Sequence, residues 1–310
     1  MLPDGRDSAA RRLVPYPVPW SASHQEATLQ FTEIRRRVIV AMFSDETLLE
    51  RLVLKGGNAL ELVHEVLFRG SVDVDLSIAD EFTDLEDTAQ RIYSALKSEF
   101  AKAGYIVFDE TFQVVPKGLI DDLTPWWGGY YVEFKLIEQV RADALGNDPQ
   151  RMRIQSEAVD AQQGRKFRVE ISKHEYCEGK ISAKIDGHTI YVYTEEMCVI
   201  EKFRAICQQM PEYGRTHPTP RARDFYDIYT TVTRRGLDLT LPENLELFRH
   251  IFAAKRVALG LLPRIADVRD FHEPDWEAVR AAVVGEVFDF SVYFDFVVEV
   301  ASGLHALWNE

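Results

Sequence analysis

Two carboxylates, Asp73 and Asp75, are the residues of this sequence best placed to carry chemistry. They alternate with Val72, Val74 and Leu76, and this period of two is typical of a half-buried strand. Residues i and i+2 of a strand project from one face with their Cα atoms roughly 6.6 Å apart, so both carboxylates point the same way. Such oxygen ligands favour Mg²⁺, which binds one or two carboxylates together with phosphate oxygens of a substrate. The alternative is a pair of acids on a solvated strand face.

A glycine pair lies before this strand and could hold those phosphates. Gly56-Gly57 follows the apolar run Leu52-Val53-Leu54 and precedes a predicted helix from Asn58 to Val66. A glycine bend at the start of a helix presents backbone N–H groups to an anion, and the absent Cβ lets a phosphate come close. The stretch matches neither the P-loop pattern nor the dinucleotide-binding glycine pattern. Alone the pair would indicate a turn, but with the two carboxylates it predicts a nucleoside triphosphate site.

The elements that position these residues divide the sequence into three parts. Residues 1–23 predict an irregular arm, because their proline run excludes helix. From residue 24 to residue 194 helices and alternating strands follow one another, whereas residues 195–310 favour helix. We therefore expect an α/β domain followed by a helical domain.

The predicted elements have the following bounds. Helices are expected at 25–42, 58–66, 83–103, 149–163, 197–210, 222–233, 245–257, 276–287 and 293–307, and strands at 52–54, 72–78, 105–115, 130–137, 167–172, 180–185 and 189–193. Arg35, Arg36 and Arg37 are expected on the solvated face of the first helix. Trp126-Trp127-Gly128-Gly129 predicts a loop, whose tryptophans are interpreted as apolar packing rather than as a platform for stacked bases.

The composition excludes several classes of protein. With 310 residues, of which 46% are hydrophobic, the chain can bury a sizeable core. The net charge of −14 argues against bulk electrostatic coating of nucleic acid, which needs a basic surface. Cys177, Cys198 and Cys207 form neither a disulfide framework nor a metal-binding pattern, so a reducing compartment is expected. With neither a signal peptide nor an apolar stretch of about 20 residues, the chain is expected in the cytoplasm and not in a membrane.

Two segments together resemble a known family. They are Leu54-Lys55-Gly56-Gly57-Asn58-Ala59-Leu60 and Arg69-Gly70-Ser71-Val72-Asp73-Val74-Asp75-Leu76. They are similar to the hallmark of the polymerase-beta-like nucleotidyltransferase superfamily, and more closely to its AbiEii/AbiGii branch of type IV toxin and abortive-infection proteins. The resemblance implies an α/β nucleotidyltransferase core with a small mixed sheet, joined to a C-terminal helical domain. It also implies the nucleotide-binding residues, which are Lys55, Gly56, Gly57, Asn58, Ser71 and Lys202.

The same resemblance implies catalytic residues on later elements. The superfamily has a third carboxylate that joins Asp73 and Asp75 at the metal, for which Glu170 and Glu133 compete, and the choice stays open. Two segments of the helical part also match the branch, 199–205 with Lys202 and 221–228 with Asp224. These two residues are implied as an active-site pair in which Asp224 positions Lys202, and Arg221 and Arg223 are implied as contacts of substrate phosphates. Spacing alone would indicate an ordinary ion pair between helices.

The implied activity is transfer of a nucleoside monophosphate from a nucleoside triphosphate to an acceptor hydroxyl, with Mg²⁺ or Mn²⁺ as cofactor. Members of the branch are toxins opposed by an antitoxin, and some modify the 3′ end of tRNA, so the resemblance implies a tRNA-directed toxin with a cognate antitoxin encoded nearby. A second hypothesis is an enzyme that adenylylates a protein or small molecule, which the acidity of the chain fits. A third is a non-catalytic module that binds nucleotides or sequesters a partner.

Overall fold

A computed structural model describes residues 22–67, 73–116, 126–159, 164–215 and 217–308 of the chain. The predicted arm therefore lies almost wholly outside the described residues, as does Ser71. The strands are β1 (Val53–Leu54), β2 (Val74–Ser77), β3 (Tyr105–Val115), β4 (Gly129–Glu138), β5 (Phe167–Ser172), β6 (Ile181–Ile185) and β7 (His188–Val192).

Helices make up most of the remaining described chain. The α-helices are α1 (Ala22–Ser44), α2 (Glu46–Arg51), α3 (Gly56–Asn58), α4 (Leu85–Ala101), α5 (Gln139–Ala144), α6 (Pro149–Gln155), α7 (Glu195–Cys207), α8 (Ala222–Arg235), α9 (Pro242–Ala254), α10 (Arg269–His272), α11 (Trp276–Ala282) and α12 (Phe290–Gly303). Shorter helical turns are the π-helix η1 (Ala59–Val63) and the 3-10 turns η3 (Pro211–Tyr213), η4 (Leu259–Asp267), η5 (Glu273–Asp275) and η6 (His305–Leu307). The predicted helix 58–66 thus begins two residues earlier and changes to a π-helix at Ala59.

The strands form one mixed sheet of seven strands in the order β3-β4-β5-β2-β1-β7-β6. β2 runs parallel to β5, and β1 runs parallel to β7, while the other pairs are antiparallel. In this register Asp75 lies opposite Glu170, which in turn lies opposite Tyr131. The predicted α/β class with a mixed sheet is confirmed.

The two faces of the sheet differ because the sequence of its strands alternates. In β5 the side chains of Phe167, Val169 and Ile171 are buried, whereas those between them are partly exposed. Helix α4 covers the apolar face, where the ring of Phe100 lies 6.0 Å from that of Phe134. The opposite, polar face of β2, β5 and β4 is therefore left for the charged residues of the site.

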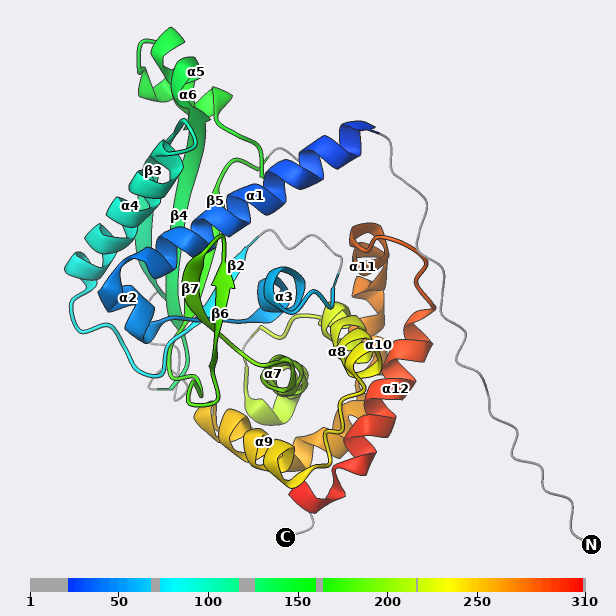
Figure 1. Cartoon of the computed structure of the whole chain (residues 1–310). Coiled ribbons are helices and arrows are strands. Elements are labelled where there is room, and N and C mark those ends of the chain that lie inside the picture. The colour runs from blue at the N-terminus through cyan, green and yellow to red at the C-terminus, as the bar shows by residue number, and fades with distance from the viewer. Residues whose placement is uncertain (1–21, 68–72, 117–125, 160–163, 216, 309–310) are drawn as a thin grey trace, which may run out of the picture.

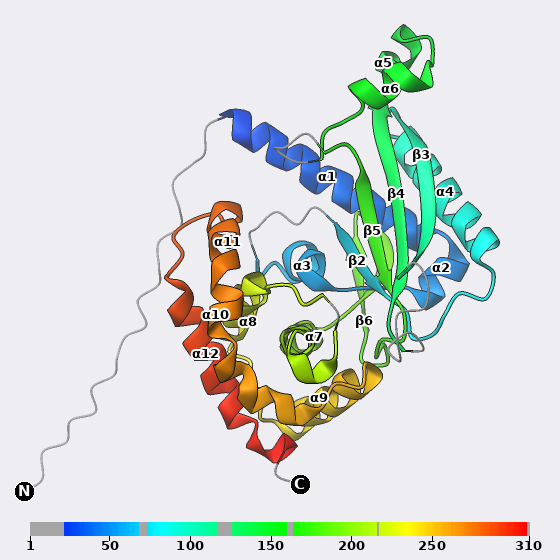
Figure 2. The same cartoon turned by 180° about the vertical axis from the view of Figure 1, so that it is seen from behind.

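The helices after the sheet surround α7. Figures 1 and 2 show α7 end-on, with α8, α9 and α12 arranged around it on the side away from the long strands. Helix α7 packs against α8 and α9, and it carries Lys202 and Arg204 among its buried residues. One apolar core runs from the strands through these helices, so the division into domains at residue 194 stays a prediction.

The prediction that Arg35 lies on the solvated face of the first helix is wrong. Its side chain is buried, with 4% of its surface exposed, because α1 crosses over the segment that follows the glycine pair. There Arg35 Nη1 forms an ion pair of 2.7 Å with Glu61 and donates to Asn58 Oδ1 at 3.1 Å. Arg36 and Arg37 are partly exposed, as expected.

Two findings bear on the environment of the chain. Within the described ranges no helix is long and apolar enough to cross a membrane. All three cysteines are free and buried.

His272 anchors the start of α8 and makes the stability of this region sensitive to acid. Its ring is fully buried beside Phe225, and its Nδ1 accepts a hydrogen bond of 2.9 Å from the backbone N–H of Arg221. Burial lowers the pKa of His272 to about 4, so the folded chain binds fewer protons than the unfolded chain between pH 6.5 and pH 4. Stability is lost as the pH falls through this window.

We expect His272→Asn, which keeps an acceptor but does not titrate, to remove this loss. Between pH 7 and pH 4 the free energy of unfolding of the unmodified protein should fall by about 3 kcal/mol more than that of the variant. Urea denaturation at several pH values measures both. If the free energy of unfolding fell equally with pH in both proteins, His272 would not be the source of the acid sensitivity.

Candidate active site

A cavity of about 810 Å³ lies between the polar face of the sheet and the helices that follow it. The sheet side contributes the glycine pair and three carboxylates, and the helical side contributes α7 and the start of α8. Residues predicted for the site that line this cavity are Lys55, Gly56, Gly57, Asp73, Asp75, Glu170, Lys202, Arg221, Arg223 and Asp224. The structure thus brings together residues that span some 170 positions of the sequence.

Gly56 packs against the carboxylate of Asp75. Gly56 has a φ of +66°, which side chains rarely adopt, and a Cβ on it would lie 2.8 Å from Oδ2 of Asp75. Lys55 holds the glycine bend close to Asp75, because its backbone N–H donates to the carbonyl oxygen of Asp75 at 3.0 Å. Glycine is therefore required at position 56 both by backbone conformation and by the space that Asp75 occupies.

Three carboxylates of the polar face line the cavity, and at each of them burial outweighs the charge of nearby cations, although Arg168 lies 3.7 Å from Glu170. Burial, followed by repulsion from Glu170, raises the pKa of Asp75 to about 7. Burial also raises the pKa of Asp73 and, with the charge of Asp73, that of Glu170. A divalent cation would stabilise the ionised forms of all three.

The donor set fits Mg²⁺ or Mn²⁺ bound in part by a substrate. Among the described residues no group of three or more His, Cys, Asp or Glu side chains already has a metal-binding arrangement. Mg²⁺ commonly takes only one or two protein carboxylates and completes its shell with water and phosphate oxygens. Asp75 with either Asp73 or Glu170 would supply that number.

Glu133, the competitor of Glu170, lies on the same face but is neutralised by other residues. It accepts hydrogen bonds from Arg168 at 2.8 Å and from Lys166 at 3.0 Å. The Arg168 hydrogen bond lowers the pKa of Glu133, in contrast to the raised pKa of Glu170. Glu133 is also not among the described residues that line the cavity. The geometry favours Glu170 as the third carboxylate.

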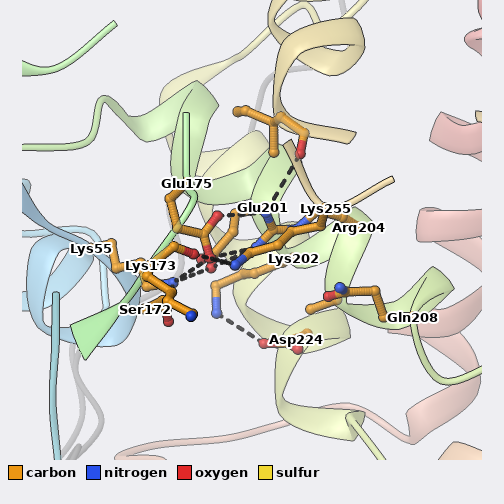
Figure 3. Close-up of polar contacts among 12 residues, drawn as sticks. Lys55, Ser172, Lys173, Glu175, Glu201, Lys202, Arg204, Gln208, Asp224 and Lys255 are labelled. Carbon is orange, nitrogen blue, oxygen red and sulfur yellow. Dashed lines mark hydrogen bonds and ion pairs between the residues drawn. The ribbon is translucent and has the colours of Figure 1, made fainter. Parts of the chain in front are cut away.

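Lys202 is held by two carboxylates of α8. Its Nζ lies 3.0 Å from Oδ1 of Asp224 and 2.6 Å from Oδ2 of Asp227 (Figure 3 shows the first contact). Burial raises the pKa of Asp224, but Arg221, whose Nε lies 2.6 Å from Oδ2, and Lys202 outweigh it, so the net shift is downward. The ammonium group is therefore fixed at the wall of the cavity.

The sequence analysis missed a buried ionic network in the wall of this cavity. Glu175 accepts hydrogen bonds from Arg204 at 2.6 Å and from Lys55 at 3.3 Å, and Lys255 lies 3.6 Å away (Figure 3). Lys55 also contacts Glu201 at 2.7 Å. Glu201 and Arg204 flank Lys202 in the matched segment 199–205, so their spacing could have indicated a shared role. Nothing in the sequence links Glu175 to Lys255.

Asn58 has contacts other than those expected of a nucleotide ligand. Its side chain is fully buried and is not among the described residues that line the cavity. Its Nδ2 donates to the backbone carbonyl of Asp73 at 2.6 Å, while its Oδ1 accepts from Arg35. Through this contact Asn58 fixes the backbone that carries the Asp73 carboxylate.

We predict that Glu175→Gln destabilises the protein strongly. The substitution leaves Lys55, Arg204 and Lys255 without their shared anion in a buried setting, where breaking an ion pair costs about 3–5 kcal/mol. Urea denaturation at pH 7 measures the change.

Glu81→Gln is the matched control. Glu81 is an exposed carboxylate that also pairs with a lysine, Lys173. Its loss should cost less than about 1 kcal/mol. Equal costs for the two variants would show that the buried network contributes no more than a surface pair.

Comparison with known families places this site in a class. The family model described as Nucleotidyl transferase AbiEii toxin, Type IV TA system, matches residues 37–300, a span that contains every residue of the cavity. The protein is a nucleotidyltransferase. The chain belongs to the AbiEii family of nucleotidyltransferase toxins of type IV toxin–antitoxin systems.

Several solved structures are similar to this chain at low identity. JHP933 from Helicobacter pylori is 16% identical, with 91% of this chain and 93% of that chain covered and a TM-score of 0.47. A putative nucleotidyltransferase from H. pylori is also 16% identical, with 91% and 96% covered and a TM-score of 0.47. The antibiotic-resistance factor ANT(2'')-Ia is 13% identical, with 75% and 96% covered and a TM-score of 0.35. A search among curated proteins gave no match.

Proposed function

We propose that the enzyme transfers a nucleoside monophosphate from a nucleoside triphosphate to an acceptor hydroxyl at the 3′ end of tRNA, with Mg²⁺ or Mn²⁺ as cofactor. The packing of Gly56 against Asp75, in one cavity with Glu170 and Lys202, is the observation that carries this proposal. It would place a phosphate-binding bend beside carboxylates whose pKa values are raised because burial outweighs the nearby cations. The membership in a nucleotidyltransferase toxin family supports it.

The residues of the sheet side would bind the triphosphate and the metal. The backbone at Gly56 and Gly57 would take the phosphates at the wall of the cavity. The N–H of Gly56 interacts with the Cys198 thiol, so we assign the phosphate contact to the first-turn N–H of Gly57, which has no acceptor within its own helix. Asp73, Asp75 and Glu170 would hold Mg²⁺, which when bound neutralises phosphate charge and polarises the phosphoryl group. Asn58 holds the backbone of Asp73 and so acts as a positioning residue.

The residues of the helical side would stabilise charge during transfer. The bond between the acceptor oxygen and the α-phosphorus forms while the bond to pyrophosphate breaks, so negative charge develops on the leaving group. Lys202 lies ready to face that charge, since Asp224 and Asp227 hold its ammonium in place and no reorganisation is needed. Glu170 would also take up the proton of the acceptor hydroxyl.

The type IV toxin–antitoxin family implies an antitoxin that opposes this enzyme in the same cell. The three free, buried thiols fit action in a reducing cytoplasm, where both a triphosphate and tRNA occur. The net charge of −14 favours a protein acceptor as the second possibility, because polynucleotides are repelled by an acidic surface.

Labelling of candidate acceptors tests the function. The full-length protein is incubated with each α-labelled nucleoside triphosphate and Mg²⁺, with and without tRNA. We expect label in tRNA and a loss of at least about 100-fold for Asp75→Asn, because one preorganised electrostatic group is removed. Asp109→Asn, a β3 carboxylate paired with Arg153 outside the cavity, is the control and should keep full activity.

Other outcomes of this labelling would overturn the proposal. Label in protein would instead support adenylylation of a protein, and a triphosphate that binds without labelling any acceptor would support a non-catalytic module.

A second pair of variants tests the third carboxylate. Glu170→Gln should lower the rate of transfer by about 100-fold or more, since it removes charge from the metal site. Glu133→Gln should change it by less than about 5-fold, because Glu133 is paired with Arg168 and Lys166. Single-turnover rates at saturating triphosphate compare the two. The reverse order of effects would assign the role to Glu133.

A further inference from the structure

The residues of the cavity wall follow one another in a fixed order across the sheet. Strands β1, β2, β5 and β4 are neighbours in that order, and Asp75, Glu170 and Tyr131 share one register on the last three. Gly56 follows β1. Neighbouring strands are about 4.8 Å apart, so Tyr131 lies beyond Glu170 as seen from the glycine bend. With the triphosphate at the glycine end, the acceptor must enter from the Tyr131 end.

A guanidinium group without a carboxylate partner lies at that end. In the part of the chain that the structure describes, Arg215 forms no ion pair, and it contacts Oε1 of Gln209 at 3.4 Å and the ring of Trp127 at 5.6 Å. Burial and the neighbouring charge of Arg221 lower the pKa of Arg215, as expected for a cation without an adjacent anion. Cavity cations that do contact carboxylates are Lys55, Lys202, Arg204, Arg221 and Lys255.

Gln209 directs this guanidinium group without neutralising it. The amide of Gln209 is buried, and its Nε2 donates to the carbonyl oxygen of Ala205 at 2.9 Å. Its Oε1 accepts from the backbone N–H of Thr219 at 2.9 Å as well as from Arg215. Because both ends of the amide are held, Arg215 has a preferred direction and keeps its full charge for a ligand.

Two aromatic rings line the same end of the cavity. Trp127 precedes β4 and Tyr131 lies on it, and both are partly exposed. The Trp127 ring lies 5.6 Å from the guanidinium carbon of Arg215, and the charge of Arg215 acts on the Tyr131 hydroxyl. One face of the Tyr131 ring is covered by Arg168 at 4.9 Å. Rings beside a cation are the means by which proteins hold single-stranded nucleic acids, because every base has a face that stacks.

We propose that Arg215, Trp127 and Tyr131 form an acceptor subsite for the terminal nucleotides of a single-stranded polynucleotide. Arg215 binds a phosphate of the acceptor strand, and the rings stack its bases. The proposal rests on the proposed function and favours a polynucleotide over a protein acceptor, which carries no phosphate there. In a chain with a net charge of −14, such recognition must be local.

Binding of a short single-stranded RNA with a free 3′ hydroxyl to the full chain tests this subsite without requiring catalysis. Arg215→Gln should weaken RNA binding by about 10-fold. It should also reduce the slope of the logarithm of affinity against the logarithm of salt concentration by the amount expected for about one phosphate contact. It should change the affinity for a non-hydrolysable triphosphate by less than about 2-fold. Arg256→Gln is the matched control, because Arg256 lies 3.6 Å from the neighbouring Trp126 ring but does not line the cavity.

A second variant tests the stacking part of the subsite independently of Arg215. Trp127→Leu should weaken RNA binding by about 5-fold with an unchanged salt dependence, since stacking carries no charge. Unchanged RNA affinity in both variants, or a loss of triphosphate affinity in place of RNA affinity, would overturn the subsite.

The transfer assay separates this proposal from the proposed function. RNA that binds through Arg215 but is never labelled would overturn the assigned acceptor and leave the subsite standing. RNA labelled equally well by the unmodified protein and by Arg215→Gln at subsaturating RNA would overturn the subsite and leave the function standing.

Discussion

The carboxylate of Glu175 is the charge around which the site is arranged. It is buried, with 5% of its surface exposed, and lies within ion-pair distance of Lys55, Arg204 and Lys255. These cations come from the end of β1, from α7 and from the end of α9, three elements far apart in the sequence. A buried charge without a partner costs several kcal/mol, so the elements are held where one anion can serve all three. Since Lys55 directly precedes Gly56, the same contacts fix the glycine bend.

This arrangement divides the electrostatics of the cavity into two parts. Around Glu175 and around Lys202, cations and carboxylates neutralise one another. On the polar face of the sheet, Asp73, Asp75 and Glu170 instead keep raised pKa values, because burial and mutual repulsion outweigh the nearby cations. Perturbed carboxylates that gather in a cavity are a mark of functional sites. The paired groups give rigidity and hold Lys202 at the cavity, and the three carboxylates with raised pKa values are left for the proposed metal ion.

Local patterns predicted much of the fold and the centre of the site. The predicted bounds of β3 and β5 agree with the structure, and for β5 the reason is the alternation of apolar and polar residues, which is a property of the strand itself. Gly56 and Asp75 were identified from a motif of twenty residues. Burial of Arg35 could not be predicted, because it depends on how α1 packs beside the π-helix. Glu175 lies outside every predicted element, and the position of Lys255 near the end of the predicted helix 245–257 does not reveal its partner.

The sequence alone could not decide whether Glu170 or Glu133 is the third carboxylate, because the two differ only in the strand register of the folded sheet. Both lie on alternating strands and on the same face, but strand register puts Glu170 opposite Asp75 and Glu133 opposite Arg168. A slip of one residue would turn Glu170 into the core and expose Val169, so the register is held by burial of apolar side chains. The same burial therefore sets the order of glycine bend, Asp75, Glu170 and Tyr131 across the cavity. Hydrophobic packing on one face of the sheet thus fixes the direction in which the proposed transfer runs on the other.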